Sequence, residues 1–429
     1  MNLRDRLQRT KGQVIRSQQE DASPPGMPLP PNDASSTDLA TLVNGTWVQT
    51  AKGRCLRVER FYPAEHVHGD QRLDALLRIP PTEWTPFVGS TDSPPFDPRL
   101  ALFIDTETTG LSRDSGTYVF LMGLGSFRDD GFSLRQYFMP HYADEEALLD
   151  LLAVELEDHQ GLVSFNGRCF DWPLVRARFI LSRRPTSDPP HHLDLLPLSR
   201  MLWRRLLPSC ALSSLEQNIL GVHRSGEDIP SYLIPQLYHD YVQSGYAPPI
   251  ARVFYHNEMD ILSLVALGTR IGTLLYASLK AEGNPFCDFL ALGRLYERVG
   301  RLDDALRAYQ IATEGTATAH VASSDAELAA KHLSLLLKGL GRHDEAIGIW
   351  QQQLGKGDLF PYIELAKYLE HRCHDYAAAR RIVLEAIERV RAQALARDAI
   401  EAQRALAELR HRLERLERRM RHHGRQNTP

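Results

Sequence analysis

Short apolar runs bounded by turn residues begin near residue 100 and predict β-strands. The first run covers residues 100–104, and two more, rich in β-branched and aromatic residues, cover 118–127 and 134–139. Gly116 and a turn at 128–131 separate them. Strands joined by such short turns pair in antiparallel order, so we expect a three-stranded meander.

Beyond the meander the pattern alternates between helical and extended. Residues 144–159 begin with acidic side chains and end before a glycine, as helices do. Residues 161–165 predict a fourth strand, 172–181 a helix behind it, and 192–196 a fifth strand. This order predicts an α/β domain over residues 100–278. Its mixed sheet has three antiparallel strands followed by parallel strands, with helices on both faces.

The chain before the sheet is polar and rich in proline. Residues 1–40 hold too little apolar surface to offset the entropy of ordering, so we expect a disordered tail. Residues 41–99 contain short β-like runs and a second cluster of prolines. They indicate an N-terminal arm or a small β subdomain.

A repeated pattern of large and small apolar residues predicts paired helices over residues 284–388. The pair Gly300-Arg301 recurs as Gly341-Arg342, 41 residues later. The size pattern resembles a short, divergent tetratricopeptide array, whose usual period is about 34 residues. Such an array stacks its helix pairs into a short superhelix, so we expect an all-α domain that binds a protein partner.

The last segment, residues 389–429, is expected to form a long basic capping helix and tail. Apolar residues alternate by three and four along it, as in a heptad seam, at Leu406, Leu409, Leu413, Leu416 and Met420. Arginines flank the seam. A helix that contacts phosphates and a helix that forms a coiled-coil dimer are the two alternatives.

Length and composition are those of a multidomain globular protein. The 429 residues correspond to two or three domains, and 43% hydrophobic with 24% charged residues excludes a wholly disordered or fibrous chain. The net charge of −4 excludes a globally basic nucleic-acid binder but not a local basic patch.

Cysteine spacing and hydropathy exclude further classes. The five cysteines form no CxxC pair, so neither a zinc finger nor a disulfide framework is expected. Scattered thiols are typical of a reduced, cytoplasmic protein. No run of about 18 apolar residues predicts a membrane-spanning helix.

Candidate chemistry begins at the end of the first strand, in the sequence Asp-Thr-Glu-Thr-Thr-Gly at 105–110. Asp105 and Glu107 are two residues apart, so on a strand both carboxylates face the same way. Like charges held that close repel unless a cation lies between them. Mg²⁺ and Mn²⁺ take oxygen ligands of this kind.

Two further segments supply matching residues. Asp171 follows the fourth strand, which is expected to lie beside the first. His256 and Asp260 are four residues apart in a helical run, so they share one helix face. We expect these side chains to converge with Asp105 and Glu107.

These three motifs, D-x-E-T-T-G, N-x-x-x-F-D and a histidine or aromatic residue shortly before Asp, together resemble the DEDD 3′–5′ exonucleases of the RNase H-like fold. The longer pattern is similar to a bacterial YprB-like branch. The resemblance covers roughly residues 100–270. It implies two divalent cations, Mg²⁺ or Mn²⁺, about 4 Å apart, held by Asp105, Glu107, Asp171 and Asp260.

The same resemblance implies contacts with a nucleic-acid substrate, DNA or RNA. Residues placed near the terminal nucleotide are Thr108, Thr109, Gly110, Leu111, Asn166 and Tyr255. A purely structural role for each of them is the alternative.

The position of the general base departs from the family pattern. One DEDD class has His five residues before the last Asp, and another has Tyr four residues before it. Here Tyr255 is five and His256 four residues before Asp260. We favour His256 as the catalytic base because an imidazole suits proton abstraction near neutral pH. Tyr255 is the second candidate, and packing roles for both are the third possibility.

The sequence therefore predicts a metal-dependent nuclease, first a 3′–5′ exonuclease, with a helical region that binds a partner. A catalytically weak nucleic-acid-binding adaptor is the alternative from another class, and a structure-specific endonuclease is the alternative enzyme. Four mutually repelling carboxylates favour an enzyme, since an adaptor does not require them.

Overall fold

The computed structural model describes residues 38–88, 95–110, 116–226, 228–277, 287–314, 323–393 and 399–426. The expected tail at 1–40 lies mostly outside these residues, but Leu39 and Ala40 belong to a short helix, α2 (Leu39–Val43), and are buried. The chain divides into two compact units, Met1–Asp288 and Phe289–Pro429, each considered by itself.

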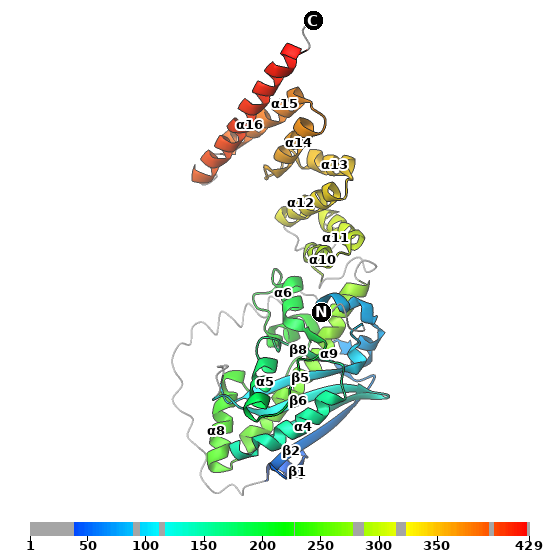
Figure 1. Cartoon of the computed structure of the whole chain (residues 1–429), viewed down its shortest axis with the longest axis vertical. Coiled ribbons are helices and arrows are strands. Elements are labelled where there is room, and N and C mark those ends of the chain that lie inside the picture. The colour runs from blue at the N-terminus through cyan, green and yellow to red at the C-terminus, as the bar shows by residue number, and fades with distance from the viewer. Residues whose placement is uncertain are drawn as a thin grey trace. The chain divides into compact units, whose positions relative to one another are not determined.

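The first unit is built on a mixed sheet (Figure 1), whose strands in the described residues are ordered β1-β2-β7-β6-β5-β8-β9. The expected meander is present as β5 (Ala101–Thr108), β6 (Val119–Arg128) and β7 (Gly131–Phe138). β8 (Gly161–Ser164) and β9 (His192–Asp194) follow in parallel. The mixed antiparallel and parallel sheet is therefore confirmed.

The N-terminal β-rich segment, for which an arm and a small β subdomain were the two expectations, adds β1 and β2 to this sheet. β1 (Thr46–Thr50) pairs with β2 (Gly53–Pro63), and β2 pairs with β7 from Leu56↔Phe138 to Pro63↔Gly131. The sequence left both alternatives open because local alternation shows a strand but not its partner. A two-stranded ribbon, short helical turns and a short helix follow: β3 (Val67–His68), β4 (Gln71–Arg72), η1 (Leu73–Arg78), η2 (Pro81–Glu83), α3 (Thr85–Val88) and η3 (Pro98–Leu100).

Helices cover both faces of the sheet. Along β7, Arg135 and Tyr137 contact Glu155 of α4 (Glu145–Glu157), whereas the intervening Gln136 contacts Asn257 of α9 (Pro248–Ala277). Because side chains alternate across a strand, α4 and α9 lie on opposite faces. The other helices and turns of this unit are η4 (Tyr142–Asp144), α5 (Asp171–Leu181), α6 (Leu195–Trp203), α7 (Leu212–Leu215), η5 (Glu216–Leu220), η6 (Ser231–Leu233) and α8 (Ile234–Ser244).

The fifth strand is shorter than expected. It ends at Asp194 because the Asp194 carboxylate accepts a hydrogen bond from Leu196 N, at 3.1 Å, and so caps α6. Leu195 and Leu196, expected in the strand, belong to that helix.

Helix α9 is the central helix of the first unit. By length and composition its stretch Pro248–Tyr276 could cross a membrane, but 72% of the apolar 18-residue window in that stretch is buried inside the protein. Packing against the sheet therefore accounts for its apolar character.

The second unit consists of helices in its described part: α10 (Phe289–Arg298), α11 (Leu302–Glu314), α12 (Ser323–Gly339), α13 (His343–Gln353), α14 (Phe360–His371), α15 (Tyr376–Gln393) and α16 (Ala399–Gln426). Each helix packs on the next along the chain. Gly300 and Gly341, the recurring glycines, both have φ near +78°, a conformation that favours glycine at the end of a helix.

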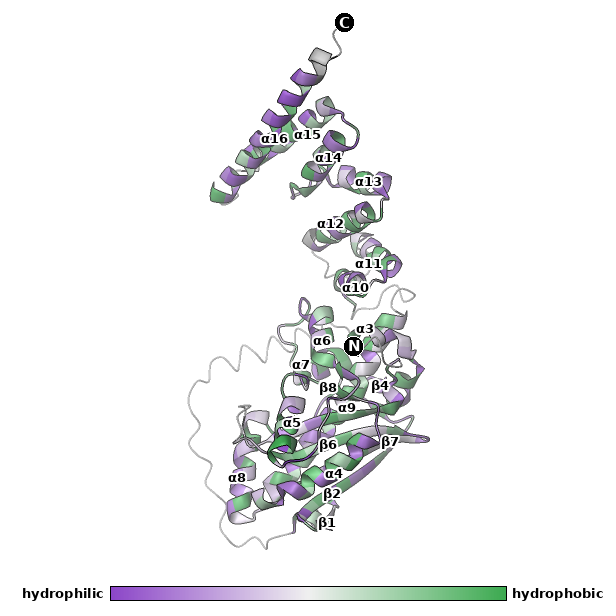
Figure 2. Ribbon diagram, in the orientation of Figure 1, coloured by the Kyte–Doolittle hydropathy of each residue, from purple (hydrophilic) through white to green (hydrophobic). Residues whose placement is uncertain are grey.

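The seam and arginines of α16 contact its own unit. Figure 2 shows α16 as mostly hydrophilic, with hydrophobic residues at intervals. Among these, Leu409 and Leu416 are buried in a cluster with α14 and α15. Arg412 and Arg415 donate to the fully buried carboxylate of Glu370 at 3.1 and 2.7 Å. The basic face therefore neutralises a buried acid, which fits a capping helix.

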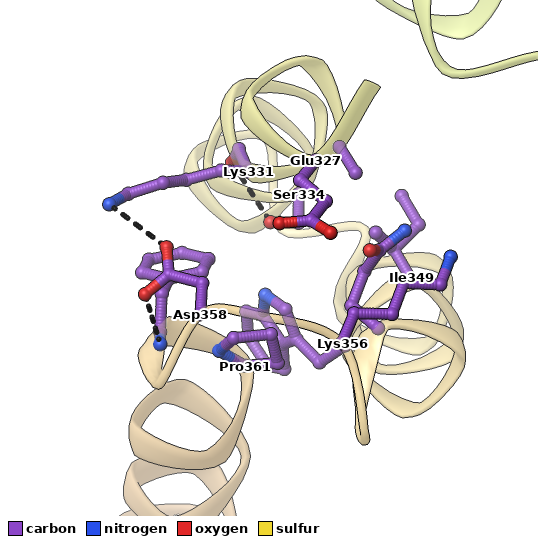
Figure 3. Close-up of a pocket in the computed structure, with 11 residues that line it drawn as sticks. Glu327, Lys331, Ser334, Ile349, Lys356, Asp358 and Pro361 are labelled. Atoms are coloured by element: carbon purple, nitrogen blue, oxygen red, sulfur yellow. Dashed lines mark hydrogen bonds and ion pairs between the residues drawn. The ribbon is translucent and has the colours of Figure 1, made fainter. Parts of the chain in front are cut away.

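A small cavity lies where α12, α13 and α14 meet (Figure 3). Trp350, Phe360 and Pro361 are among its lining residues, and Lys331 forms an ion pair with Asp358 at its rim. Its interior volume is about 10 Å³. That is room for about one water molecule, so the cavity does not suit a ligand.

Glycine at position 123 allows α9 to approach the sheet. A Cβ there would lie 2.2 Å from Asn257 Oδ1. Gly123→Ala should displace the buried Asn257 side chain and lower the free energy of unfolding by about 1–3 kcal/mol. Urea denaturation measures this change. Gly268→Ala, in the same helix as Asn257, is the control, because its Cβ would meet Leu76 at an ordinary 3.4 Å. Equal stability of the two variants would contradict the argument.

Candidate active site

The first two acids lie within a strand rather than after it. β5 continues to Thr108, so Asp105 pairs with Gly123 and Glu107 with Leu121 in the register with β6. Asn257 Nδ2 donates to Asp105 Oδ2 at 2.8 Å. The carboxylate of Asp105 is thus fixed by the central helix, through the space that Gly123 leaves.

Asp171 is the first residue of α5 and follows a tight loop after β8. Asn166 in this loop has a φ of +67°. Its backbone N–H donates to Asp194 Oδ1 at 2.8 Å, and Arg168 N donates to Asp194 Oδ2 at 3.2 Å. Asp194 therefore anchors the loop, and the Thr106 hydroxyl donates to the Asp171 carboxylate.

Helix α9 brings His256 and Asp260 to the acids of β5. His256 Nε2 lies 3.4 Å from Asp260 Oδ2 and 4.0 Å from Glu107 Oε1. One ligand atom from each of these three side chains lies within 4.8 Å of the others. The i, i+4 spacing inferred from the sequence thus places both helix residues on one face of α9, next to Glu107.

Burial and neighbouring acids raise the pKa values of three carboxylates in the cluster. Burial first, and then the charges of Asp260, Glu107 and Asp171, raise the pKa of Asp105 well above its usual range. Burial, followed by Asp260 and Asp171, does the same to the pKa of Glu107. Burial also raises the pKa of Asp171, to about 6. The four acids are therefore close enough to share one electrostatic environment.

Three charged residues to which the sequence reasoning gave no role complete the site. Arg224 donates to both carboxylate oxygens of the buried Glu216, at 2.6 and 2.8 Å, and forms an ion pair with Asp260. Asp228 Oδ1 lies 2.7 Å from His256 Nδ1. No periodic pattern identifies these residues, because Arg224 and Asp228 lie in a loop whose course only the fold defines.

A buried polar chain connects this network to the N-terminal ribbon. Ser263 donates to Glu216 at 2.5 Å, and His68 Nε2 lies 2.9 Å from the Ser263 hydroxyl. Burial, with the charges of His66 and Arg224, lowers the pKa of His68 to about 4. A neutral His68 can thus sit beside the hydroxyl without adding charge to the site.

The expected substrate-contacting residues make local contacts. Thr108 Oγ1 donates to Gly110 O at 2.7 Å, and Thr109 Oγ1 accepts from Tyr118 N at 3.0 Å. Tyr255 Oη accepts from Ser225 N at 3.0 Å. Leu111 lies outside the described residues. Substrate contacts by these residues, and by Asn166, stay predictions.

Arg176 and Arg178 of α5 and Arg184 after it form ion pairs. Arg178 binds Glu145 and lies over the ring of Tyr118, and Arg184 binds Asp150. These partners neutralise the guanidinium groups of Arg178 and Arg184, so both side chains fit structural roles better than contacts with the phosphates of a nucleic acid.

The donor set fits a divalent cation. Ligand atoms of Glu107, His256 and Asp260 lie within 4.8 Å of one another, and Asp105 interacts electrostatically with Glu107, Asp260 and Asp171. Oxygen donors of this type are those that Mg²⁺ and Mn²⁺ prefer. Asp105, Glu107, Asp171 and Asp260 would hold such ions, with His256 beside them.

Comparison with known proteins agrees with this geometry. Residues 102–271, which contain all four acids and His256, match the model of the RNase_H superfamily. The uncharacterized protein YprB of Bacillus subtilis (strain 168) is 30% identical over 341 residues, covering 78% of this chain and 80% of YprB. The chain therefore belongs to the YprB family, with an RNase_H-superfamily domain.

The acids predict how stability depends on pH and metal. A carboxyl group whose pKa is higher in the folded than in the unfolded protein stabilises the fold while it is protonated. This contribution is fully present below the pKa of the unfolded state and is lost as pH rises through the pKa of the folded state. For Asp171 the pKa of the folded state is about 6. In EDTA, the melting temperature should therefore fall between about pH 4 and pH 7. Mn²⁺ should raise it more at about pH 8 than at about pH 5, because ligands must be deprotonated.

Differential scanning fluorimetry measures both effects. Asp105→Asn should reduce the response to Mn²⁺, whereas Asp129→Asn, in the turn between β6 and β7, should keep it. A response to Mn²⁺ that is the same in wild type and Asp105→Asn would contradict a cation at these acids.

Proposed function

We propose that this chain hydrolyses phosphodiester bonds in DNA or RNA, as a 3′–5′ exonuclease of the DEDD type with two divalent cations. Membership of the RNase_H superfamily indicates a nuclease. The observation that supports the finer assignment is the convergence of Asp105, Glu107, Asp171 and Asp260, from three separated motifs, on one buried cluster beside His256.

Each side chain has a role in this proposal. Asp105 and Glu107 from β5, Asp171 from α5 and Asp260 from α9 hold the cations. When bound, such a pair of cations activates water and stabilises the charge on the leaving oxygen. Asn257 and Thr106 orient Asp105 and Asp171.

His256 is the proposed general base. Its Nε2 faces Glu107 and Asp260, where a water beside the cations would lie. The hydroxyl of Tyr255 instead accepts a hydrogen bond from the backbone of Ser225. The geometry therefore favours His256 over Tyr255.

One contact favours the alternative of a catalytically weak nucleic-acid-binding adaptor. Arg224 forms an ion pair with Asp260, one of the four proposed ligands. If this pairing excluded a cation, the domain would bind nucleic acid without cleaving it.

The helical second unit is proposed to bind a protein partner as a tetratricopeptide-like array. Successive helices that pack on their neighbours support this proposal, as do the paired glycine turns.

Nuclease activity is tested with end-labelled single- and double-stranded DNA and RNA in Mn²⁺. Wild type should release mononucleotides from the 3′ end. Asp105→Asn should reduce the rate by more than about 100-fold, because substituting even a residue that only hydrogen-bonds a metal ligand typically lowers activity about 10–100-fold. Asp129→Asn is the surface control. Products cut within the strand would identify the chain as an endonuclease. Binding of nucleic acid without cleavage would identify it as an adaptor.

The general base is tested by comparing two neighbouring variants. His256→Ala should reduce the rate about 10²–10⁴-fold. Tyr255→Phe removes only a hydroxyl that accepts from Ser225 N, so its effect should be small. Steady-state kinetics measure both. The opposite order would assign the proton transfer to Tyr255.

A further inference from the structure

We infer that Asp228 is a positioning residue that fixes the orientation and tautomer of His256; this inference rests on the proposed function. Asp228 Oδ1 lies 2.7 Å from His256 Nδ1, the shortest polar contact of that ring in the described residues. It lies on the loop between η5 and η6, 28 residues before the histidine.

The contact identifies which ring nitrogen carries hydrogen. Arg224 Nη1 also lies near Nδ1, at 3.2 Å, and a bare Nδ1 would accept from it. However, a bare nitrogen 2.7 Å from a carboxylate oxygen would place two lone pairs against each other. The shorter contact therefore decides the tautomer, and Nδ1–H donates to Asp228.

With Nδ1 engaged, Nε2 is the nitrogen turned toward the four acids. It lies 3.4 Å from Asp260 Oδ2 and 3.2 Å from the Ser231 hydroxyl, which can donate to it. In this tautomer Nε2 carries the lone pair of the ring on the side of the acids, and as general base it would accept a proton from a water that takes the place of the Ser231 hydroxyl. Catalytic and metal-binding histidines are commonly oriented in this way, by a carboxylate that accepts a hydrogen bond from the ring nitrogen that does not take part in the reaction.

Asp228 is itself held in place. Arg224 Nη1 lies 3.6 Å from its carboxylate, and Arg252 donates to its backbone carbonyl at 3.1 Å. Arg224 is in turn fixed by the buried Glu216. The orienting acid therefore belongs to a connected network, although it lies on a loop.

The alternative role, a fifth metal ligand, does not fit its position. Asp228 contacts Nδ1, whereas Glu107 and Asp260 contact Nε2. The imidazole ring therefore stands between Asp228 and the proposed ligands.

A double-mutant cycle tests the inference. Asp228→Ala should lower kcat about 10–100-fold and leave KM within about twofold. In a His256→Ala background the same change should have almost no effect, because Asp228 acts only through the histidine. Asp228→Asn keeps an acceptor oxygen, so its kcat should lie between those of wild type and Asp228→Ala. Asp240→Asn, an exposed acid of α8, is the control. Additive losses would overturn the inference.

A second measurement does not depend on activity. In protein with ¹⁵N-labelled histidines, assigned with His256→Gln, long-range NMR spectra report which nitrogen of His256 is protonated. Wild type and Asp228→Asn should show Nδ1–H, and Asp228→Ala should lose this preference. An unchanged tautomer in Asp228→Ala would refute the positioning role. If wild type cleaves no substrate, the proposed function fails, and the spectra still decide the role of Asp228.

Discussion

Mutual repulsion among buried carboxylates is the constraint on which the first unit depends. Asp105, Glu107 and Asp171 all have pKa values raised by burial and by neighbouring acids. The fold holds them together with directed hydrogen bonds, from Asn257 to Asp105 and from Thr106 to Asp171. An arrangement that lowers stability in this way is typical of sites where function requires the charge.

The architecture explains how residues distant in sequence reach one site. β5 lies between β6 and β8, so the loop after β8 carries Asp171 to the same edge as Glu107. Helix α9 crosses the face of β5, β6 and β7, where Gly123 lets Asn257 come close. Each proposed ligand therefore comes from a helix or a strand, and Asp228, which contacts His256, comes from a loop.

The sequence predicted the strands and helices of the mixed sheet from local periodicity, whereas the expected proximity of the motif residues came from the sheet order and from the resemblance to the DEDD exonucleases. It did not predict that β2 joins β7, since pairing partners are tertiary information. The roles of Arg224 and Asp228 were not predicted for a related reason. Their roles arise from contacts with Glu216 and His256, which lie 8 and 28 residues away in sequence, and no local pattern encodes those distances.

Arg224 is shared between Glu216 and Asp260: against the effect of burial, the charge of Asp260 and then the contacts with Glu216 raise the pKa of its guanidinium. Arg224 donates to both oxygens of the buried Glu216, so this pair is close to neutral. Its contact with Asp260 involves Oδ1, and Oδ2 faces His256. In the proposed nuclease, divalent cations would balance the charge of the remaining acids. Because Arg224 binds Oδ1 of Asp260 and leaves Oδ2 on the side of His256, its position is compatible with such cations, which favours the nuclease proposal over the adaptor.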